Sequence, residues 1–255
     1  MLEDRIHQLR QKKGLLLMPH LVLGSPSFDE NRKLIATMVA AGAEIIELQI
    51  PFSEQMADGP VILKANDEAL KRGTTVSGCL DFAKIICAEH PDTIFIFMTY
   101  FNVLFSYGVE KFVAQAKAIG IQGLIVPDLT PEEGQDYIDA CNKEGVASIF
   151  LFTPTSTPDR LKTVAHYGKG MAYCVGRKGV TGIRTKMDAS LKDLIKKYRA
   201  ATKLPIALGF GIQEKDDIDA IGSDIDIAVI GTKILLVHQE QGAEAVGQFL
   251  RSLRK

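Results

Sequence analysis

One pattern repeats along the whole chain and limits the folds open to it. A short apolar run rich in strand-forming residues is followed by a break marked by Gly, Pro or Asp, and then by a segment of helical periodicity. The apolar runs are mostly continuous rather than alternating, which is typical of parallel strands covered on both faces. They lie at 15–23, 43–50, 94–99, 121–126, 146–152, 171–176, 204–209 and 225–230.

Helical periodicity fills the segments between these runs. Helices are expected at 29–41, 61–72, 78–89, 108–118, 131–144, 158–166, 188–201, 213–220 and 240–254. Several begin with capping signals: Ser27 or Asp29 before the first, Thr130-Pro131 before the fifth and Pro158 before the sixth.

Eight strands with crossover helices in 255 residues match the size of a (β/α)₈ TIM barrel, an α/β fold. We expect one domain over residues 1–255, because no linker or low-complexity stretch interrupts the pattern. A doubly wound open sheet is the competing architecture. Its G-x-G-x-x-G fingerprint is absent after the first run, which favours the barrel.

Composition narrows the class of protein. Thirty basic and 31 acidic side chains give a formal charge of −1, so no net field favours nucleic acid or an anionic membrane as partner. No apolar run reaches membrane-spanning length, and the first residues are charged and lack the apolar core of a secretory signal. The four cysteines show no C-x-x-C spacing and are expected to be reduced. These features predict a soluble, cytoplasmic protein.

The loops that follow the strands should form the working face of such a barrel. Two of them, 51–60 and about 177–187, are longer than most such connections, and long loops usually carry function. Glycines end the last two runs, at Gly211 and at Gly231-Thr232, where barrels commonly bind phosphate through backbone N–H groups and helix N-termini. Together with Gly182 in the second long loop, they predict a phosphate site.

The catalytic candidates are few. The histidines have no metal-ligand spacing, no G-x-S-x-G elbow occurs, and no lysine lies within an apolar run to form a Schiff base. Carboxylates remain, of which Glu47 is the most informative because a charge inside an apolar strand is costly unless it is paired or neutral. Strand periodicity places Glu47 on the side of Ile45 and Gln49. A strand-end glutamate that reaches water is the alternative.

The other candidates have stronger structural alternatives. Asp58 stands in an Asp-Gly pair, which is ordinary turn chemistry, and Asp128 could equally cap a helix or brace a loop. Tyr100 and Tyr173 lie near the ends of two apolar runs, where they could donate hydrogen bonds or serve only in packing.

The chain resembles a known family in several motifs, which occur in the family's order and spacing. These are IIELQIPFSEQMADGP, FMTYFN, GLIVPDLTPEE, YCVGRKGVTG, GFGI and IGTKI, and they are similar to the α subunit of tryptophan synthase over about residues 1 to 250. The resemblance implies retro-aldol cleavage of indole-3-glycerol phosphate to indole and glyceraldehyde 3-phosphate. It also implies a β-subunit partner in an allosteric α₂β₂ assembly, and neither a metal nor an organic cofactor.

Roles carry over by position in the motifs. The resemblance implies that Glu47 moves the proton, that Asp58 accepts a hydrogen bond from the indole N–H, and that Tyr173 lies near the glycerol chain. It assigns the phosphate to Gly182, Gly211, Gly231 and Thr232, and the indole pocket with its lid to Ile62, Tyr100, Thr181 and Phe210. Asp128 resembles a residue that steadies the 177–187 loop.

Four departures from the family pattern fall around this pocket. Gln49 replaces a glycine, His20 a phenylalanine, Gly176 a serine, and Glu54-Gln55 an Asp-Pro pair. Gln49 could fill space or hydrogen-bond Glu47. Two hypotheses follow: a lyase whose activity is retained or weakened, or a regulatory subunit that has lost most lyase chemistry but activates the β subunit. Other phosphate-binding barrels, a sugar-phosphate isomerase or an indole-glycerol-phosphate synthase, fit less well because the strand lysine is missing and ADGP occurs with GVTG.

Overall fold

The structure is a computed structural model that describes residues 1–56, 58–176, 189–209, 211–221 and 224–254. Its strands are β1 (Leu16–Val22), β2 (Ile45–Gln49), β3 (Ile94–Met98), β4 (Gly123–Ile125), β5 (Ala147–Ile149), β6 (Leu151–Phe152), β7 (Ala172–Val175), β8 (Ile206–Gly209) and β9 (Ile227–Ile230). Its helices are α1 (Leu2–Lys13), α2 (Phe28–Ala40), α3 (Pro60–Lys71), α4 (Val76–Glu89), α5 (Phe101–Tyr107), α6 (Val109–Ala118), α7 (Gln135–Glu144), α8 (Pro158–Tyr167), α9 (Ala189–Ala201), α10 (Lys215–Ile221) and α11 (Thr232–Ser252).

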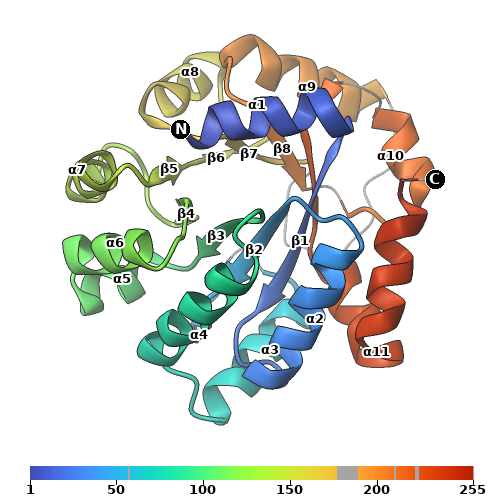
Figure 1. Cartoon of the computed structure of the whole chain (residues 1–255). Helices are drawn as coiled ribbons and strands as arrows, with labels where there is room; N and C mark the ends of the chain where they lie inside the picture. Colours follow the sequence, from blue (N-terminus) through green and yellow to red (C-terminus); the bar gives the residue numbers. More distant parts are fainter. Residues whose placement is uncertain (57, 177–188, 210, 222–223, 255) are drawn as a thin grey trace.

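The strands pair in parallel in the order β5-β4-β3-β2-β1-β9-β8-β7-β6, and this sheet closes on itself (Figure 1). Only Phe150 separates β5 from β6, so the two are parts of one barrel strand. The N–H of Tyr173 donates to the Phe150 carbonyl at 3.2 Å, and the N–H of Lys169 donates to the Ser148 carbonyl at 2.9 Å. These bonds join the two ends of the sheet. The predicted (β/α)₈ barrel is therefore confirmed, and the open-sheet alternative is wrong.

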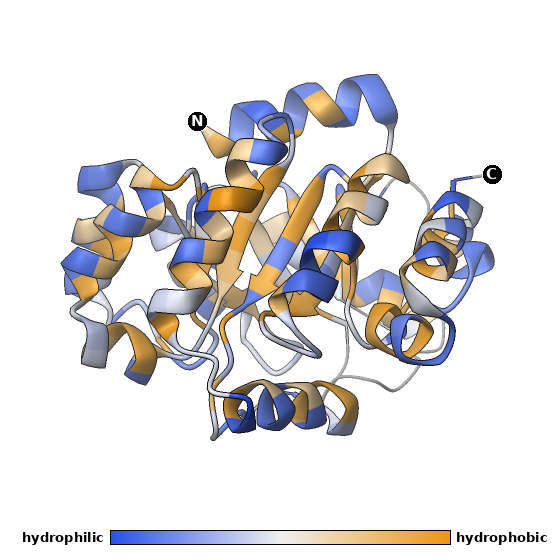
Figure 2. Ribbon diagram, turned by 60° about the horizontal axis from the view of Figure 1, so that its bottom comes forward, coloured by the Kyte–Doolittle hydropathy of each residue, from blue (hydrophilic) through white to orange (hydrophobic). Residues whose placement is uncertain are grey.

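Alternate residues of each strand face opposite layers, as the period of a strand requires. On β2, Ile46 and Leu48 pack in the outer layer between barrel and helices, whereas Ile45 belongs to the barrel interior. Figure 2 shows the consequence: hydrophobic strands lie at the centre, and the surrounding helices carry hydrophilic residues on their outer sides. This pattern puts Glu47 and Gln49 on the inner side, as predicted.

The amino end of the barrel is closed by α1, which the sequence reading did not include among the helices. Helix α1 lies across the barrel in Figure 1, and its Leu2 and Ile6 pack with the interior residues Leu16, Met18 and Met171. This end is filled with apolar side chains, and barrels of this kind bind their ligands at the opposite end, where the strands have their carboxyl ends.

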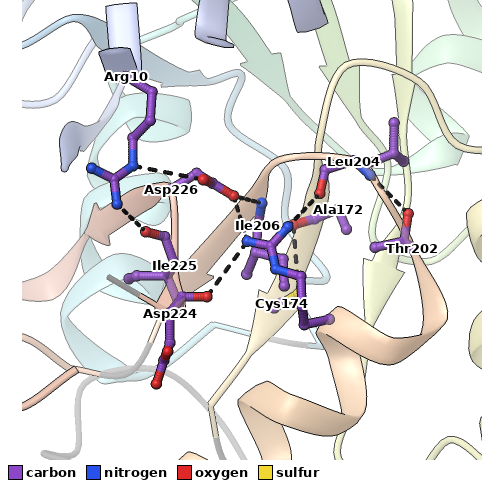
Figure 3. A network of polar contacts seen from close by, with 10 residues as sticks. Arg10, Ala172, Cys174, Thr202, Leu204, Ile206, Asp224, Ile225 and Asp226 are labelled. Carbon is purple, nitrogen blue, oxygen red and sulfur yellow. Dashed lines mark hydrogen bonds and ion pairs between the residues drawn. The ribbon is translucent and has the colours of Figure 1, made fainter. Parts of the chain in front are cut away.

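Two carboxylates, the half-buried Asp226 and the buried Glu44, stabilise the amino end of the barrel. Asp226 precedes β9 and receives the N–H of Ile206 at 2.8 Å and the guanidinium of Arg199 at 2.6 Å, while Arg10 of α1 lies 3.6 Å away (Figure 3). Arg10 also donates to the Ile225 carbonyl at 3.1 Å. This cluster links α1, α9 and the starts of β8 and β9.

Glu44, just before β2, likewise links helices to strand starts, on the side of β1 opposite to Asp226. Its side chain is 1% exposed and accepts the Leu17 N–H at 3.0 Å. Arg254 donates to both of its oxygens at 2.6 Å, and Lys13 lies 3.4 Å away. The carboxylate thus ties the end of α11 and the end of α1 to two strands.

Several element boundaries differ from expectation. The helix expected from 131 begins at Gln135, because the preceding residues form turns: Glu133 N–H donates to the Thr130 carbonyl and Gly134 N–H to the Pro131 carbonyl. The helix expected over 240–254 begins at Thr232 and is interrupted at Gly242, whose φ of 82° is left-handed. The caps before α2 and α8 are Ser27 and Thr157, whose side chains accept backbone N–H groups.

The expected reduced state of the cysteines agrees with the structure. Cys79, Cys141 and Cys174 are buried, Cys87 is half-buried, and all four are free thiols. Burial raises the pKa of the Cys79 thiol to about 12, so it is not poised to act as a nucleophile. Among the described helices, none is long and apolar enough to cross a membrane.

Candidate active site

Glu47 lies inside the barrel, paired with side chains from two other strands. The register places it beside His20 on β1, and His20 Nδ1 is 2.9 Å from Glu47 Oε1. Tyr173 of β7 reaches across the interior and donates its hydroxyl to Glu47 Oε2 at 3.4 Å. Glu47 is 2% exposed, so the alternative of a glutamate that reaches water is wrong.

Asp58 is the second buried carboxyl group of this end, in the loop between β2 and α3. Gln49 Nε2 donates to Asp58 Oδ2 at 2.8 Å, and the Tyr100 hydroxyl donates to the same oxygen at 3.5 Å. Gln49 was expected to fill space or bond Glu47. Its amide instead pairs with Asp58, and the residue that pairs with Glu47 is His20.

Burial and the two carboxyl groups shift the pKa values of three side chains at this site. Burial alone would lower the pKa of His20, but the charge and hydrogen bond of Glu47, the charge of Asp58 and the Gln49 side chain outweigh burial and raise it. Burial is the main reason that the pKa of Asp58 is raised, against the opposing effects of Gln49 and His20. Burial, with the nearby charges of Glu47 and Asp58, raises the pKa of Tyr173 well above its usual value, so this hydroxyl stays a donor.

Two buried polar atoms at this site complete no hydrogen bond of ordinary geometry within the described part of the chain. They are His20 Nε2 and Gln49 Oε1, on side chains that are 3% and 0% exposed. Buried polar groups are nearly always satisfied, and exceptions tend to mark functional sites. A protonated His20 would offer a donor at Nε2, and Gln49 offers an acceptor.

The candidate phosphate glycines fall at the carboxyl ends of β8 and β9. Gly211 follows β8 with φ +78°, and Gly231 precedes α11, whose first residue is Thr232. A Cβ added at Gly231 would lie 3.7 Å from Ile62 Cδ1 and 3.9 Å from His20 Cβ. Gly231, Ile62 and His20 are therefore neighbours. The remaining candidates Gly182, Thr181 and Phe210 lie outside the described residues.

Asp128 has a different role from the paired carboxyl groups. Both of its oxygens accept the N–H of Phe101, at 2.9 and 3.1 Å, so Asp128 holds the start of α5. The loop that the resemblance associates with Asp128 lies outside the described residues. Tyr100, the residue before α5, is 1% exposed and stacks on Phe52 with ring centroids 5.3 Å apart.

Asn66 is a site-building residue that the sequence reading missed. Its Oδ1 accepts the Phe52 N–H at 3.1 Å and its Nδ2 donates to the Ile62 carbonyl at 2.9 Å, so it ties the loop after β2 to α3. The signal was present: Asn66 stands among the apolar positions Ile62, Ala65 and Ala69 of one helix face. A polar residue on the buried face of a helix needs a partner.

A cavity of about 420 Å³ lies beside the loop after β2. It includes both residues of the Glu54-Gln55 departure, and its lining is Phe52, Ser53, Glu54, Gln55, Met56, Leu63, Tyr100 and Asp128. Among the residues that the structure describes, no group of three His, Cys, Asp or Glu side chains is arranged to hold a metal ion.

Comparison with known proteins agrees with this geometry. Residues 6–252 match the family model of the tryptophan synthase alpha chain. The chain is 49% identical to the tryptophan synthase alpha chain of Syntrophotalea carbinolica over 254 residues, covering 100% of both chains. It is also 49% identical to that of Desulfotalea psychrophila, covering 99% of both.

Solved structures share the fold over the same length. A structure of Mycobacterium tuberculosis tryptophan synthase superimposes with a TM-score of 0.92 at 28% identity, covering 99% of this chain and 96% of that one. A structure from Aquifex aeolicus gives 0.91 at 31% identity, covering 99% and 97%. The chain thus belongs to the tryptophan synthase alpha chain family and is a lyase of the kind that cleaves indole-3-glycerol phosphate.

Proposed function

We propose that Glu47 and Asp58 are the two carboxyl groups with which this chain cleaves indole-3-glycerol phosphate. The observation that carries the proposal is their placement: both are buried inside the carboxyl end of the barrel, and His20, the partner of Glu47, adjoins Gly231 at the start of α11. A substrate with an aromatic ring at one end and a phosphate at the other fits between carboxyl groups and a helix N-terminus.

Each carboxyl group has a separate task in the reaction. Cleavage needs a proton delivered to indole C3 and a proton removed from the hydroxyl next to the breaking C–C bond, after which the hydroxyl carbon becomes the aldehyde. Glu47 can do both in turn, because a carboxyl group that gives up its proton can take one back. Asp58 accepts the indole N–H and offsets the positive charge that develops on the ring. Tyr173 donates to Glu47 and holds it in place.

Phosphate binding is assigned to the glycines at the ends of β8 and β9. Gly211, Gly231 and Thr232 follow the carboxyl ends of these strands, where backbone N–H groups commonly bind phosphate, and α11 adds the partial positive charge of its N-terminus. Gly182 completes the set by resemblance. The resemblance likewise assigns Ile62, Thr181 and Phe210 to the pocket around the ring.

The Gly231→Ala variant tests this phosphate site without disturbing the fold. Its φ of −96° is negative, with a ψ of −90° just beyond the right-handed helical region, and a Cβ there meets only ordinary contacts with Ile62 and His20. A methyl group nevertheless keeps the phosphate from approaching the backbone. We expect KM to rise about tenfold, the loss of one hydrogen bond to a charged group, with Tm unchanged. An unchanged KM would place the phosphate elsewhere.

Gln49 sets a second expectation, because its amide already donates to Asp58 Oδ2, one of the two oxygens to which the indole N–H could donate. In the proposed reaction the Gln49 side chain therefore competes with the substrate for Asp58. We expect Gln49→Gly to raise kcat/KM about tenfold, corresponding to about 1.4 kcal/mol. Steady-state assays of indole release check this. Gln49→Met separates the causes, since it keeps the volume and removes only the hydrogen bond; an unchanged rate in both variants would show that Gln49 is no obstacle.

The partner assigned by this proposal is the tryptophan synthase β subunit, in the α₂β₂ form expected from the resemblance and within the cytoplasm. Two of the solved structures with this fold are described as tryptophan synthase complexes of Pyrococcus furiosus. The loop after β2 offers a surface for such a partner: Met56 is 76% exposed beside the cavity that contains Glu54 and Gln55. Phe105 on α5 is 69% exposed.

Indole release from indole-3-glycerol phosphate by the purified chain, with and without the β subunit, tests the proposal. Turnover by the chain that rises when the partner is added supports it. No turnover in either mixture, together with a large stimulation of the partner's own reaction, would instead support the regulatory alternative. Neither the fold nor the family comparison favours that alternative.

A further inference from the structure

His20 forms a buried pair with Glu47, and the proposed reaction gives His20 itself no role. Their side chains are 4% and 2% exposed, and His20 Nδ1 lies 2.9 Å from Glu47 Oε1. They stand on neighbouring strands at partner positions of the register, so the backbone fixes their separation. A hydrogen bond of this length between an imidazole and a carboxyl group is a path for a proton.

The surroundings favour one extra proton on this pair. The charged groups that act on His20 are Glu47 on β2 and Asp58 in the loop after it, and both are negative when ionised. Gln49 on β2 is neutral, Tyr173 on β7 stays protonated, and α11 contributes Gly231, which has no side chain. Despite burial, the pKa of His20 is raised by Glu47 first and then by Asp58 and Gln49.

We propose that His20 and Glu47 hold one proton in common, and that this shared proton is the one delivered to the substrate. The inference rests on the proposed role of Glu47 and deepens it: His20 is the positioning residue that keeps Glu47 supplied with its proton near neutral pH. An unpaired carboxyl group, with an ordinary pKa of about 4.3, would lose that proton at a lower pH than an imidazole, with about 6.5.

The proton count balances over one turnover. In the resting pair the proton is on His20 and Glu47 is a carboxylate. The proton passes along the Nδ1–H···Oε1 bond to Glu47, which gives it to indole C3 and leaves a neutral His20 beside a carboxylate. As the C–C bond breaks, its electron pair stays with the ring and the aldehyde carbonyl forms. Glu47 takes the hydroxyl proton and returns it to His20, so no proton is gained from or lost to water.

The pH dependence of kcat/KM distinguishes this role from a structural one. The pair keeps its proton below the raised pKa of His20 and loses it above, so the wild-type chain should lose activity only as the pH rises through a value above 6.5. In His20→Phe this loss of activity should begin at least one pH unit lower. The ratio of wild-type to variant kcat/KM should therefore grow about tenfold between pH 6 and pH 8. His20→Asn can still donate to Glu47 but cannot titrate, and it should show the same shift.

Two results would overturn the proposal. One is a His20→Phe variant whose kcat/KM falls at the same pH as that of the wild type, and the other is a His20→Asn variant with the wild-type pH profile. If neither variant folds, ¹⁵N NMR of the His20 ring in the wild-type chain decides. The ring should be protonated at pH 7 and should lose the proton at this pH in Glu47→Gln, because the largest cause that raises its pKa is then gone. A ring that is neutral at pH 7 in the wild type contradicts the proposal.

The same set of proteins keeps the two proposals apart. Turnover that survives in Glu47→Gln would contradict the proposed function itself. An inactive Glu47→Gln chain, combined with a pH profile that is the same in the wild type and in the His20 variants, would contradict only the shared proton.

Discussion

Replacing Glu47 with Gln should lower kcat for indole release about 10³-fold or more. The amide keeps the size of the side chain and can still accept from His20 and Tyr173, so the fold and the pocket should survive. What is lost is the ability to take up and release a proton, and positioned acid–base groups typically contribute 10² to 10⁴ in rate. Single-turnover assays with excess enzyme at pH 7 measure the chemical step directly.

Tyr173→Phe is the matched control for this result. It removes a donor to the same carboxyl group, at a long 3.4 Å, and leaves the proton-transfer group intact. We expect a reduction of less than about tenfold, the value of one ordinary hydrogen bond. If Glu47→Gln kept more than a tenth of the wild-type rate, or if Tyr173→Phe were the more damaging change, Glu47 would not be the proton-transfer group.

The second large effect concerns stability rather than catalysis. Glu44→Ala should reduce the free energy of unfolding by about 3–5 kcal/mol, the usual cost of removing one partner of a buried ion pair. The variant leaves the Leu17 N–H without its acceptor and leaves Arg254 and Lys13 without their counter-charge. For a chain of this size the change lowers Tm by about 10 °C. Urea unfolding followed by circular dichroism measures it.

Glu89→Ala provides the comparison, because Glu89 forms an ion pair with Arg32 on the exposed surface of the helical layer. Exposed pairs contribute little, so Tm should change by no more than about 2 °C. Kinetics supply a further check, since Glu44 lies at the end of the barrel remote from the proposed site. A Glu44→Ala chain with wild-type Tm would mean that water or a neighbouring group replaces the carboxylate without cost.

The barrel itself could be predicted because its signal is local. Continuous apolar runs, separated by helical segments of the right length, leave few architectures, and strand periodicity alone assigned Glu47 to the same face as Ile45. The predictions that were wrong concern the boundaries of the helices. The Thr130-Pro131 capping signal was real in composition, yet its residues form turns and α7 begins at Gln135. Turn and helix starts use the same residue types, so tertiary packing decides between them.

The candidate site shows a sharper limit. The residues could be named one by one, but which of them pair depends on the register between strands. His20 meets Glu47 because β1 and β2 are aligned at these two positions, and Gln49 reaches Asp58 because the loop folds back over the strand end. The role of α1 was missed for a similar reason. Leu2 and Ile6 form only a short apolar stripe, and they are buried because they fill the amino end of the barrel.

The division of the charged side chains between the two barrel ends has a practical consequence for protein engineering. Glu44 and Asp226 anchor the amino end, whereas His20, Glu47 and Asp58 lie at the carboxyl end, and apolar residues such as Met18 and Ile227 pack in the interior. Thermal stability can therefore be selected by substitutions at the amino end of the barrel, while substrate preference is diversified at the carboxyl end. Libraries aimed at each end should combine with little epistasis, because within the described residues no hydrogen bond or ion pair joins Glu44 or Asp226 to His20, Glu47 or Asp58.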